Sequence, residues 1–131
     1  MVKFTVYGEP IPKGSTRAFV VNGKAVTTNA NKNTKGWQTL ISLVAQEHRP
    51  AELIDKAVGL QLTFIMTRPK SVSINKRPLP TVKPDLDKLI RCVLDALTGI
   101  IFVDDSQVTE LKALKQYNDS DYAPGVEIII Y

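Results

Sequence analysis

The run DLDKLIRCVLDALTGIIFVDDSQV, residues 85–108, decides how this chain is expected to fold. Its first half carries apolar side chains at spacings of three and four, which is typical of one buried face of an α-helix over residues 85–98. These apolar residues are Leu86, Leu89, Ile90, Val93, Leu94 and Leu97. Gly99 stands where the C-terminal cap of that helix belongs. The apolar residues 100–103 then predict a short strand, which ends at Asp104 and Asp105.

Segments on both sides of this run alternate between strand and helix patterns. A second helix is predicted over residues 31–48, where Trp37, Ile41 and Ala45 lie on one apolar face. Period-two patterns and turn residues predict strands over residues 2–7, 57–66, 108–117 and 126–131, and a hairpin over 18–28 that turns at Asn22-Gly23. The chain is therefore expected to form one α+β (mixed α/β) domain over residues 1–131. In this fold a mixed β-sheet carries two main helices packed on one face.

The overall composition is that of an ordinary globular protein. The 131 residues suit one domain, and the formal net charge of +4 allows a nucleic-acid partner without requiring one. Cys92 is the only cysteine, which excludes an intramolecular disulfide and a zinc site made of cysteines alone. The sequence has no leader-like N-terminus and no run of about 20 apolar residues, so we expect a soluble cytoplasmic protein.

A basic, proline-rich segment leads directly into the helix predicted at residues 85–98. Residues 67–84 have no clear periodicity, and they contain four prolines and no acidic residue. A long loop of this kind inside a small domain is usually functional or disordered. We therefore expect this loop to contact phosphates through basic residues that include Lys76, Arg77 and Lys83.

Two acidic clusters, Asp85/Asp87 and Asp104/Asp105, flank the predicted helix and strand. At 1.5 Å per residue, the helix runs about 21 Å away from the first cluster. The extended segment after Gly99 covers roughly the same distance in return. If the two elements are antiparallel, carboxylates from both clusters face one point.

Carboxylates gathered in this way repel one another unless a cation lies between them. Mg²⁺ suits such a site, because it prefers oxygen ligands and commonly binds one or two carboxylates together with a substrate phosphate. In phosphodiester hydrolysis such an ion activates the attacking water and neutralises charge on the leaving oxygen. A plainer interpretation stays open, in which Asp85 is a helix N-cap and Asp104-Asp105 an ordinary turn.

Basic residues near these clusters also have two interpretations. Arg91, four residues after Asp87, forms either an ion pair on the helix surface or a cation that meets a phosphate oxygen beside the metal. Lys13 and Arg17 flank Gly14 in a predicted turn, and they are either solvated or in contact with phosphate.

Residues 85–108 resemble the signature of the RusA-type Holliday junction resolvases, which are crossover junction endodeoxyribonucleases. That signature reads Asp-x-Asp-Asn, a Lys four residues after the second Asp, then Asp-Ala-Leu, and later Asp-Asp-x-Gln-Val. The matching positions are Asp85, Asp87, Asp95-Ala96-Leu97 and Asp104-Asp105-Ser106-Gln107-Val108. The N-terminal GEPIPKGSTRAF is similar to the Pro-Lys-Gly-x-x-Arg opening of phage-borne members, so the resemblance covers most of the chain.

The resemblance implies a homodimer, without membrane contact, that introduces paired nicks at four-way DNA junctions. It implies Mg²⁺ as the cofactor, with Mn²⁺ as an alternative, and Asp85, Asp87 and Asp105 as the metal ligands. It also suggests a bacterial or prophage source. Two positions depart from the family pattern, because Lys88 replaces the Asn and Arg91 replaces the Lys. Arginine keeps the positive charge but stays protonated, so it can hold a phosphate and cannot readily supply a proton.

We therefore expect catalytic roles for Asp85, Asp87, Asp105 and Arg91. The residues expected to contact DNA are Lys13, Arg17, Lys76, Arg77, Lys83 and Lys88. Three alternatives remain at this point. They are a nuclease of the same chemistry that prefers forks or flaps, a non-catalytic protein that binds junctions or other branched DNA, and a structural domain with capped helices.

Overall fold

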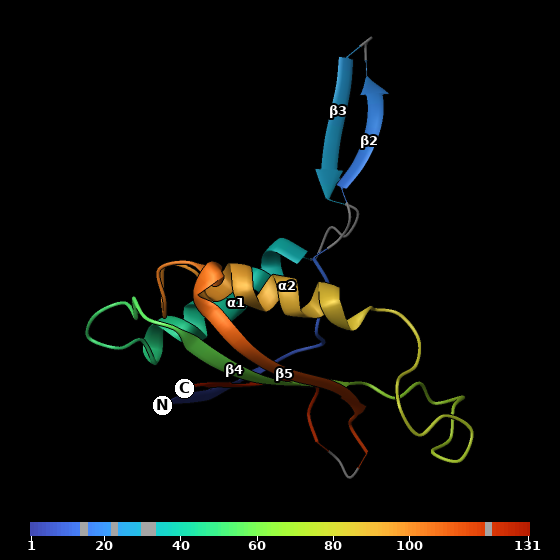
Figure 1. Ribbon diagram of the computed structural model, residues 1–131. Coiled ribbons are helices and arrows are strands. Elements are labelled where there is room, and N and C mark those ends of the chain that lie inside the picture. The colour runs from blue at the N-terminus through green and yellow to red at the C-terminus, as the bar shows by residue number, and fades with distance from the viewer. Residues whose placement is uncertain (14–15, 22–23, 30–33, 120–121) are drawn as a thin grey trace.

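The computed structural model describes residues 1–13, 16–21, 24–29, 34–119 and 122–131, and of residues 16–21 and 24–29 it describes the backbone. Its helices are α1 (Thr34–Glu47), α2 (Leu86–Leu97) and the short 3₁₀ helix η1 (Asp105–Gln107). Its strands are β1 (Val2–Tyr7), β2 (Thr16–Val21), β3 (Lys24–Asn29), β4 (Val58–Met66), β5 (Val108–Tyr117) and β6 (Gly125–Ile130). Figure 1 shows α1 and α2 on one face of the main sheet, which confirms the predicted α+β fold. None of the helices in the described ranges combines the length and apolar composition needed to cross a bilayer.

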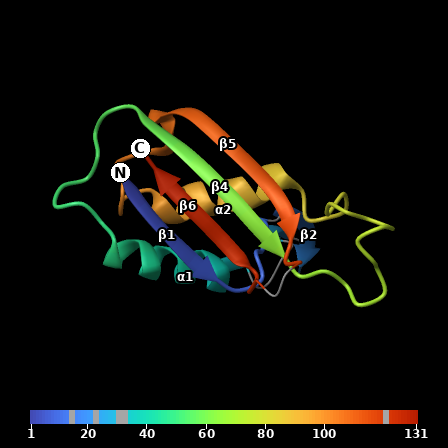
Figure 2. The same ribbon diagram turned by 90° about the horizontal axis from the view of Figure 1, so that it is seen from below.

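The main sheet is mixed, with the strand order β1-β6-β4-β5. β6 pairs antiparallel with both β1 and β4, whereas β4 pairs parallel with β5. Parallel neighbours need a long crossover connection, and α2 lies within the one that joins β4 to β5. Figure 2 shows the face of the sheet that the helices do not cover, with β1 and β5 at its two edges.

The hydrophobic core lies between the main sheet and the two helices. Alternate residues of β4, namely Leu60, Leu62 and Phe64, are fully buried, as a period of two predicts. Ile41 of α1 and Leu89 of α2 are equally inaccessible. The apolar faces predicted for these three elements therefore meet in one core.

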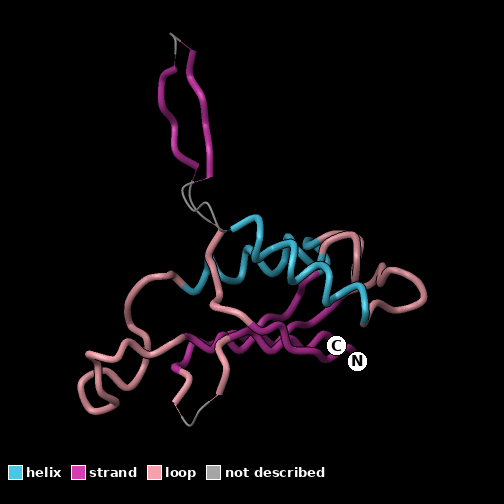
Figure 3. The backbone as a smooth tube through the Cα atoms, turned by 180° about the vertical axis from the view of Figure 1, so that it is seen from behind, coloured by secondary structure: helices cyan, strands magenta, loops and turns pink. Residues whose placement is uncertain are grey.

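A second, two-stranded sheet stands apart from the first. β2 and β3 pair antiparallel, and Figures 1 and 3 show them projecting away from the helices. The strands of the predicted hairpin are confirmed, while its expected turn at Asn22-Gly23 lies outside the described residues. The segment that leads into β2 is fastened to both helices. The backbone N–H of Lys13 donates to the carbonyl oxygen of Lys88 at 3.0 Å, and Thr34 Oγ1 donates to the carbonyl oxygen of Pro12 at 2.7 Å.

The predicted strand at residues 100–103 is wrong, because the chain makes a compact turn there. Gly99 adopts a φ of +82°, and its N–H donates to the carbonyl oxygen of Phe102 at 2.7 Å. The N–H of Ile101 still donates to the carbonyl oxygen of Leu97 at 3.0 Å. Ile101 and Phe102 are fully buried against the end of α2. A buried turn and a short buried strand give the same apolar run, so the sequence pattern does not distinguish them.

Gly125 provides a test of the packing between β1 and β6. A methyl group at Gly125 would lie 2.4 Å from the carbonyl oxygen of Val6, a backbone atom held by the strand pairing. We expect Gly125→Ala to lower the free energy of unfolding by about 2–3 kcal/mol. Gly36→Ala in α1 is the matched control, since no neighbouring atom lies within 4 Å of the added methyl group, and it should raise stability by at most ~1 kcal/mol. Urea unfolding measures the stability of both variants. Equal stabilities of Gly125→Ala and Gly36→Ala would contradict the close pairing of β1 with β6.

Candidate functional site

Asp85 and Asp87 stand at the beginning of α2. Asp85 is the N-cap residue, with extended backbone (φ −69°, ψ 140°), yet its carboxylate accepts no capping hydrogen bond. Asp87 lies in the first turn, and both residues are exposed. The positive end of the helix dipole favours negative charge at this position. The N-cap interpretation therefore accounts for where Asp85 lies but leaves its carboxylate available to a ligand.

Asp104 and Asp105 differ in what their carboxylates do. The side chain of Asp104 accepts a hydrogen bond from the N–H of Ser106 at 3.0 Å, and its own N–H donates to Gln107 Oε1 at 2.8 Å. These contacts form a capping box around η1. Hydrogen bonding from the Ser106 side chain, and then from its backbone N–H, holds the pKa of Asp104 below its usual value. Asp105 is exposed, and its carboxylate takes no part in the box. Asp105 is therefore the member of the pair that remains available to a ligand.

The two acidic clusters lie at opposite ends of α2, because the chain turns at Gly99 instead of returning along the helix. The 12 residues of α2 separate its ends by about 18 Å. β5 gives a similar separation between the two clusters. It begins directly after η1, and about 23 Å further along the strand the side chain of Lys115 donates to the carbonyl oxygen of Pro84, the residue before Asp85. The expectation that carboxylates from both clusters face one point is thus wrong for a single chain. Among the described residues, which include all four aspartates, no group of three or more metal-binding side chains occurs.

Arg91 lies on α2 one turn beyond Asp87. Both salt bridges in the part of the chain that the structure describes involve other residues, so Arg91 does not pair with Asp87. Arg91 is also exposed. Of its two interpretations, the ion pair on the helix surface is therefore absent, and the guanidinium faces solvent on the helix that begins with the first acidic cluster.

Lys13 is bound to α2 by its side chain as well as its backbone. Its Nζ lies 2.9 Å from Oδ2 of Asp95, and the two side chains are 35% and 32% exposed. The ammonium that was expected to contact phosphate thus takes part in an ion pair within the chain. Arg17, the other cation of this segment, belongs to β2, where side chains lie outside what the structure describes.

Arg68 organises the basic loop, a role for which the sequence carried no separate signal. Its guanidinium donates to both carboxylate oxygens of Asp119, at 2.6 and 2.9 Å, and stacks over the ring of Tyr117 at 4.2 Å from the centroid. These hydrogen bonds hold the pKa of Asp119 below its usual value. The same guanidinium donates to the carbonyl oxygens of Ser73, Arg77 and Pro78. Residues 67–84 therefore form no helix or strand, as predicted, yet they follow a path defined by hydrogen bonds.

The three loop residues expected to contact DNA have different surroundings. Arg77 is half-buried, and its Nε donates to the hydroxyl of Tyr117 at 2.8 Å. Lys76 and Lys83 are exposed, and Lys88 in the first turn of α2 is half-buried. The two exposed lysines are therefore better placed than Arg77 to meet a phosphate.

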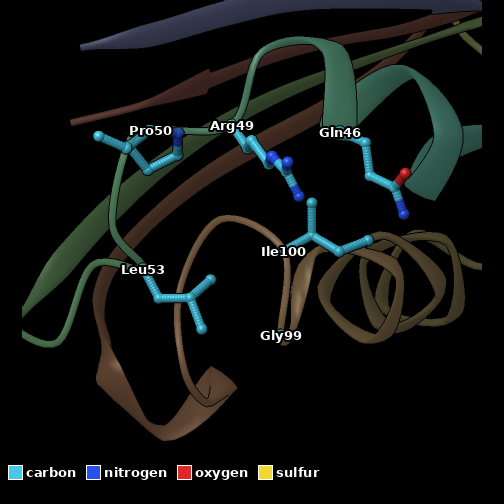
Figure 4. A pocket seen from close by; sticks show the side chains of 7 residues that line it. Gln46, Arg49, Pro50, Leu53, Gly99 and Ile100 are labelled. Carbon is cyan, nitrogen blue, oxygen red and sulfur yellow. The ribbon is translucent and has the colours of Figure 1, made fainter.

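Of two cavities in the part of the chain that the structure describes, one lies beside the first acidic cluster and the other lies away from it. An open cavity of about 530 Å³ lies at the far end of α2, where Figure 4 shows Arg49 pointing toward Ile100. None of the expected catalytic residues lines it. A second cavity of about 110 Å³ lies beside Pro84 and Lys115, next to the first acidic cluster. Asp85 and Asp87 therefore stand on an exposed surface, which suits a large ligand better than a small enclosed one.

Known proteins match the chain along almost its whole length. The family described as Endodeoxyribonuclease RusA matches residues 8–131, a range that includes both acidic clusters and α2. A relative from Bacillus subtilis (strain 168), the uncharacterized protein YqaN, is 38% identical over 138 residues, which cover 98% of this chain and 94% of the relative. The chain therefore belongs to the RusA endodeoxyribonuclease family.

Proposed function

We propose that this protein is a Mg²⁺-dependent endodeoxyribonuclease that resolves Holliday junctions, during recombination and repair, by paired nicking of four-way DNA. Membership of the RusA family supports the nuclease class. The observation that carries the proposal is the pair of exposed aspartates at the start of α2, since Asp85 occupies the N-cap position without using its carboxylate there. We take residues 1–131 as one endonuclease domain that acts on DNA in the cytoplasm.

Asp85 and Asp87 suit Mg²⁺, because this ion commonly takes one or two carboxylates, keeps several waters and accepts further oxygens from a phosphate. Mn²⁺ accepts the same kind of ligands and is the alternative. When bound, the ion supplies activation of the attacking water and neutralises charge on the leaving oxygen. Asp105 is the third ligand in this proposal, although within one chain it lies beyond the far end of α2, a helix about 18 Å long.

The homodimer offers a source for that third carboxylate, which is the partner's Asp105. β5 is an edge strand, and no other strand of the described ranges pairs with its outer side. Two β5 strands paired antiparallel about a twofold axis at Leu111 would set Glu110 opposite the partner's Lys112. The same pairing brings the beginning of one β5 to the end of the other. The partner's Asp105 then approaches Asp85, and each of two sites draws on both chains.

DNA contacts in this proposal come from cations around the start of α2. The proposed phosphate contacts are Lys76, Lys83, Lys88, Arg91 and, from the hairpin, Arg17. Lys13 and Arg77 contribute where DNA displaces their partners within the chain, which are Asp95 and Tyr117. Since each neutralised phosphate releases counterions, binding should weaken as salt rises.

Cleavage of a synthetic four-way junction tests the proposal. With Mg²⁺ the purified protein should introduce paired nicks, and with chelator or on linear duplex it should not. Asp85→Asn, Asp87→Asn and Asp105→Asn should each abolish nicking and leave the fold intact, because each removes a charged ligand with little change in volume. Asp104→Asn is the matched control. It weakens the cap of η1, so it should reduce stability slightly and retain most of the nicking.

Other outcomes of the same assay identify the alternatives. Retention of the junction on a gel without cleavage in any divalent metal would indicate a non-catalytic protein that binds junctions or branched DNA, and would overturn the proposal. Preferred cutting of forks or flaps would keep the chemistry and change the substrate. An essential Asp104 together with a dispensable Asp105 would contradict the assignment of the ligands.

Arg91 is proposed to hold a scissile or neighbouring phosphate beside the metal. It is exposed, it makes no salt bridge in the described ranges, and it follows Asp87 by one helical turn. Arg91→Ala should lower the nicking rate by about a hundredfold or more while junction binding persists. Arg91→Lys should retain most activity, because it keeps the charge. Single-turnover nicking and gel-shift affinity measure the two effects, and an Arg91→Ala variant that cuts at the wild-type rate would refute the role.

Mixing two inactive variants tests whether the sites are shared between chains. Asp87→Asn and Asp105→Asn form heterodimers in which one site combines an intact Asp87 with the intact Asp105 of the other chain. The mixture should recover single nicks at about a quarter of the wild-type rate, since about half of the dimers are mixed and each has one intact site. Asp87→Asn mixed with Asp85→Asn is the control, because every shared site then keeps a defect. No recovery in the first mixture, or sedimentation of an active monomer, would exclude the shared site.

A further inference from the structure

Lys115 makes an unusual set of contacts for an ammonium group near the surface. Its Nζ donates to the carbonyl oxygen of Val82 at 2.9 Å and to that of Pro84 at 2.8 Å. The register of β4 and β5 pairs Lys115 with the buried Phe64, so the side chain starts from the face of the sheet that the helices cover. Lys115 is half-buried, and within the described ranges it takes part in neither of the two salt bridges. Its charge is therefore held by two backbone carbonyls of one short segment.

That segment is the one that leads into the first acidic cluster. Pro84 directly precedes the N-cap Asp85, whose carbonyl oxygen accepts from the N–H groups of Lys88 and Leu89 at 3.2 Å each. Lys115 thus connects a strand of the sheet to the point where α2 begins. Hydrogen bonds from a charged donor are stronger than those between neutral groups, so this connection restrains the backbone at Pro84.

The other end of the loop is held in a comparable way. Arg68 is the second residue of the basic loop, residues 67–84, and its side chain is only 12% exposed. It donates to three loop carbonyls and to Asp119, while its backbone N–H donates to Asn118 Oδ1 at 2.9 Å. Residues 67–84 are therefore fixed at the beginning by Arg68 and at the end by Lys115, in a stretch that has no helix or strand of its own.

We propose that Lys115 is a positioning residue, which fixes the backbone at Pro84 so that Asp85 and Asp87 are preset for a divalent cation. The inference rests on the proposed metal-dependent function of those two aspartates. A preset pair of ligands binds metal more tightly, because less ordering of the backbone is left to occur on binding. Lys115 itself does not touch the metal or the DNA in this proposal. Its effect passes through the carbonyl oxygens that it holds.

Lys115→Met removes the ammonium and keeps a long apolar stem. We expect faster amide exchange at Lys88 and Leu89, because the start of α2 loses its restraint. The concentration of Mn²⁺ needed for half-saturation, measured by paramagnetic resonance without DNA, should rise by about 10–100-fold, as is usual when a residue that supports metal ligands is lost. The nicking rate at saturating Mn²⁺ should stay within a few-fold of wild type. This difference between metal affinity and maximal rate separates a positioning role from a catalytic one.

Lys3→Met is the matched control, since Lys3 is an exposed lysine on β1, at the other edge of the same sheet, where it pairs with Ile129. It should change neither amide exchange nor Mn²⁺ affinity. Lys115→Arg keeps the charge and should restore part of the affinity lost in Lys115→Met. Should Lys115→Met fail to fold, Lys115→Gln gives the same comparison with a polar side chain.

The measurements distinguish failure of the inference from failure of the proposed function. Unchanged exchange at Lys88 and Leu89 in Lys115→Met, or an unchanged Mn²⁺ titration, would overturn the positioning role even if the wild-type protein cuts junctions. A wild-type protein that neither binds Mn²⁺ nor cuts junctions would instead overturn the metal-dependent function, and the positioning role with it.

Discussion

Burial of one face of α2 against the sheet is the interaction on which the rest of the structure depends. Leu89, Val93 and Leu97 are fully buried, and they fix the helix along its whole length. A helix of 12 residues is rigid on this scale, so its two ends stay about 18 Å apart. That distance decides the form of the proposed metal site. Asp85 and Asp87 belong to one end and Asp105 to the other, and no side-chain rotation within one chain brings the three together.

Much of the fold could be predicted because burial leaves a periodic trace in the sequence. The alternation in β4 and the apolar stripe of α2 each correspond to a face that is buried in the structure. The prediction of a strand at residues 100–103 failed for a physical reason. Ile101 and Phe102 are buried in a turn, and the sequence pattern of a short buried turn is the same as that of a short buried strand. The four aspartates were singled out because a motif contains them, and their role as metal ligands stays a prediction. Lys115 was missed, because its contacts depend on strand register and leave no local signal.

The number of basic residues proved a weak guide to the surface that DNA would meet. Lys13 pairs with Asp95, Arg68 pairs with Asp119, and Arg77 donates to Tyr117. In each case the positive charge helps to hold a connecting segment against the body of the protein. Because such a connection has no repeating backbone hydrogen bonds of its own, side-chain donors take their place. A count of charges in the sequence cannot separate these internal donors from cations that face solvent.

Arg91 restricts the chemistry that the proposed site can perform. A guanidinium keeps its positive charge in proteins, so Arg91 suits a phosphate contact better than proton transfer. The aspartates at the start of α2 are exposed. The contribution of Arg91 is then purely electrostatic. It acts on charge that develops at a phosphate, which requires a fixed position and no particular pKa.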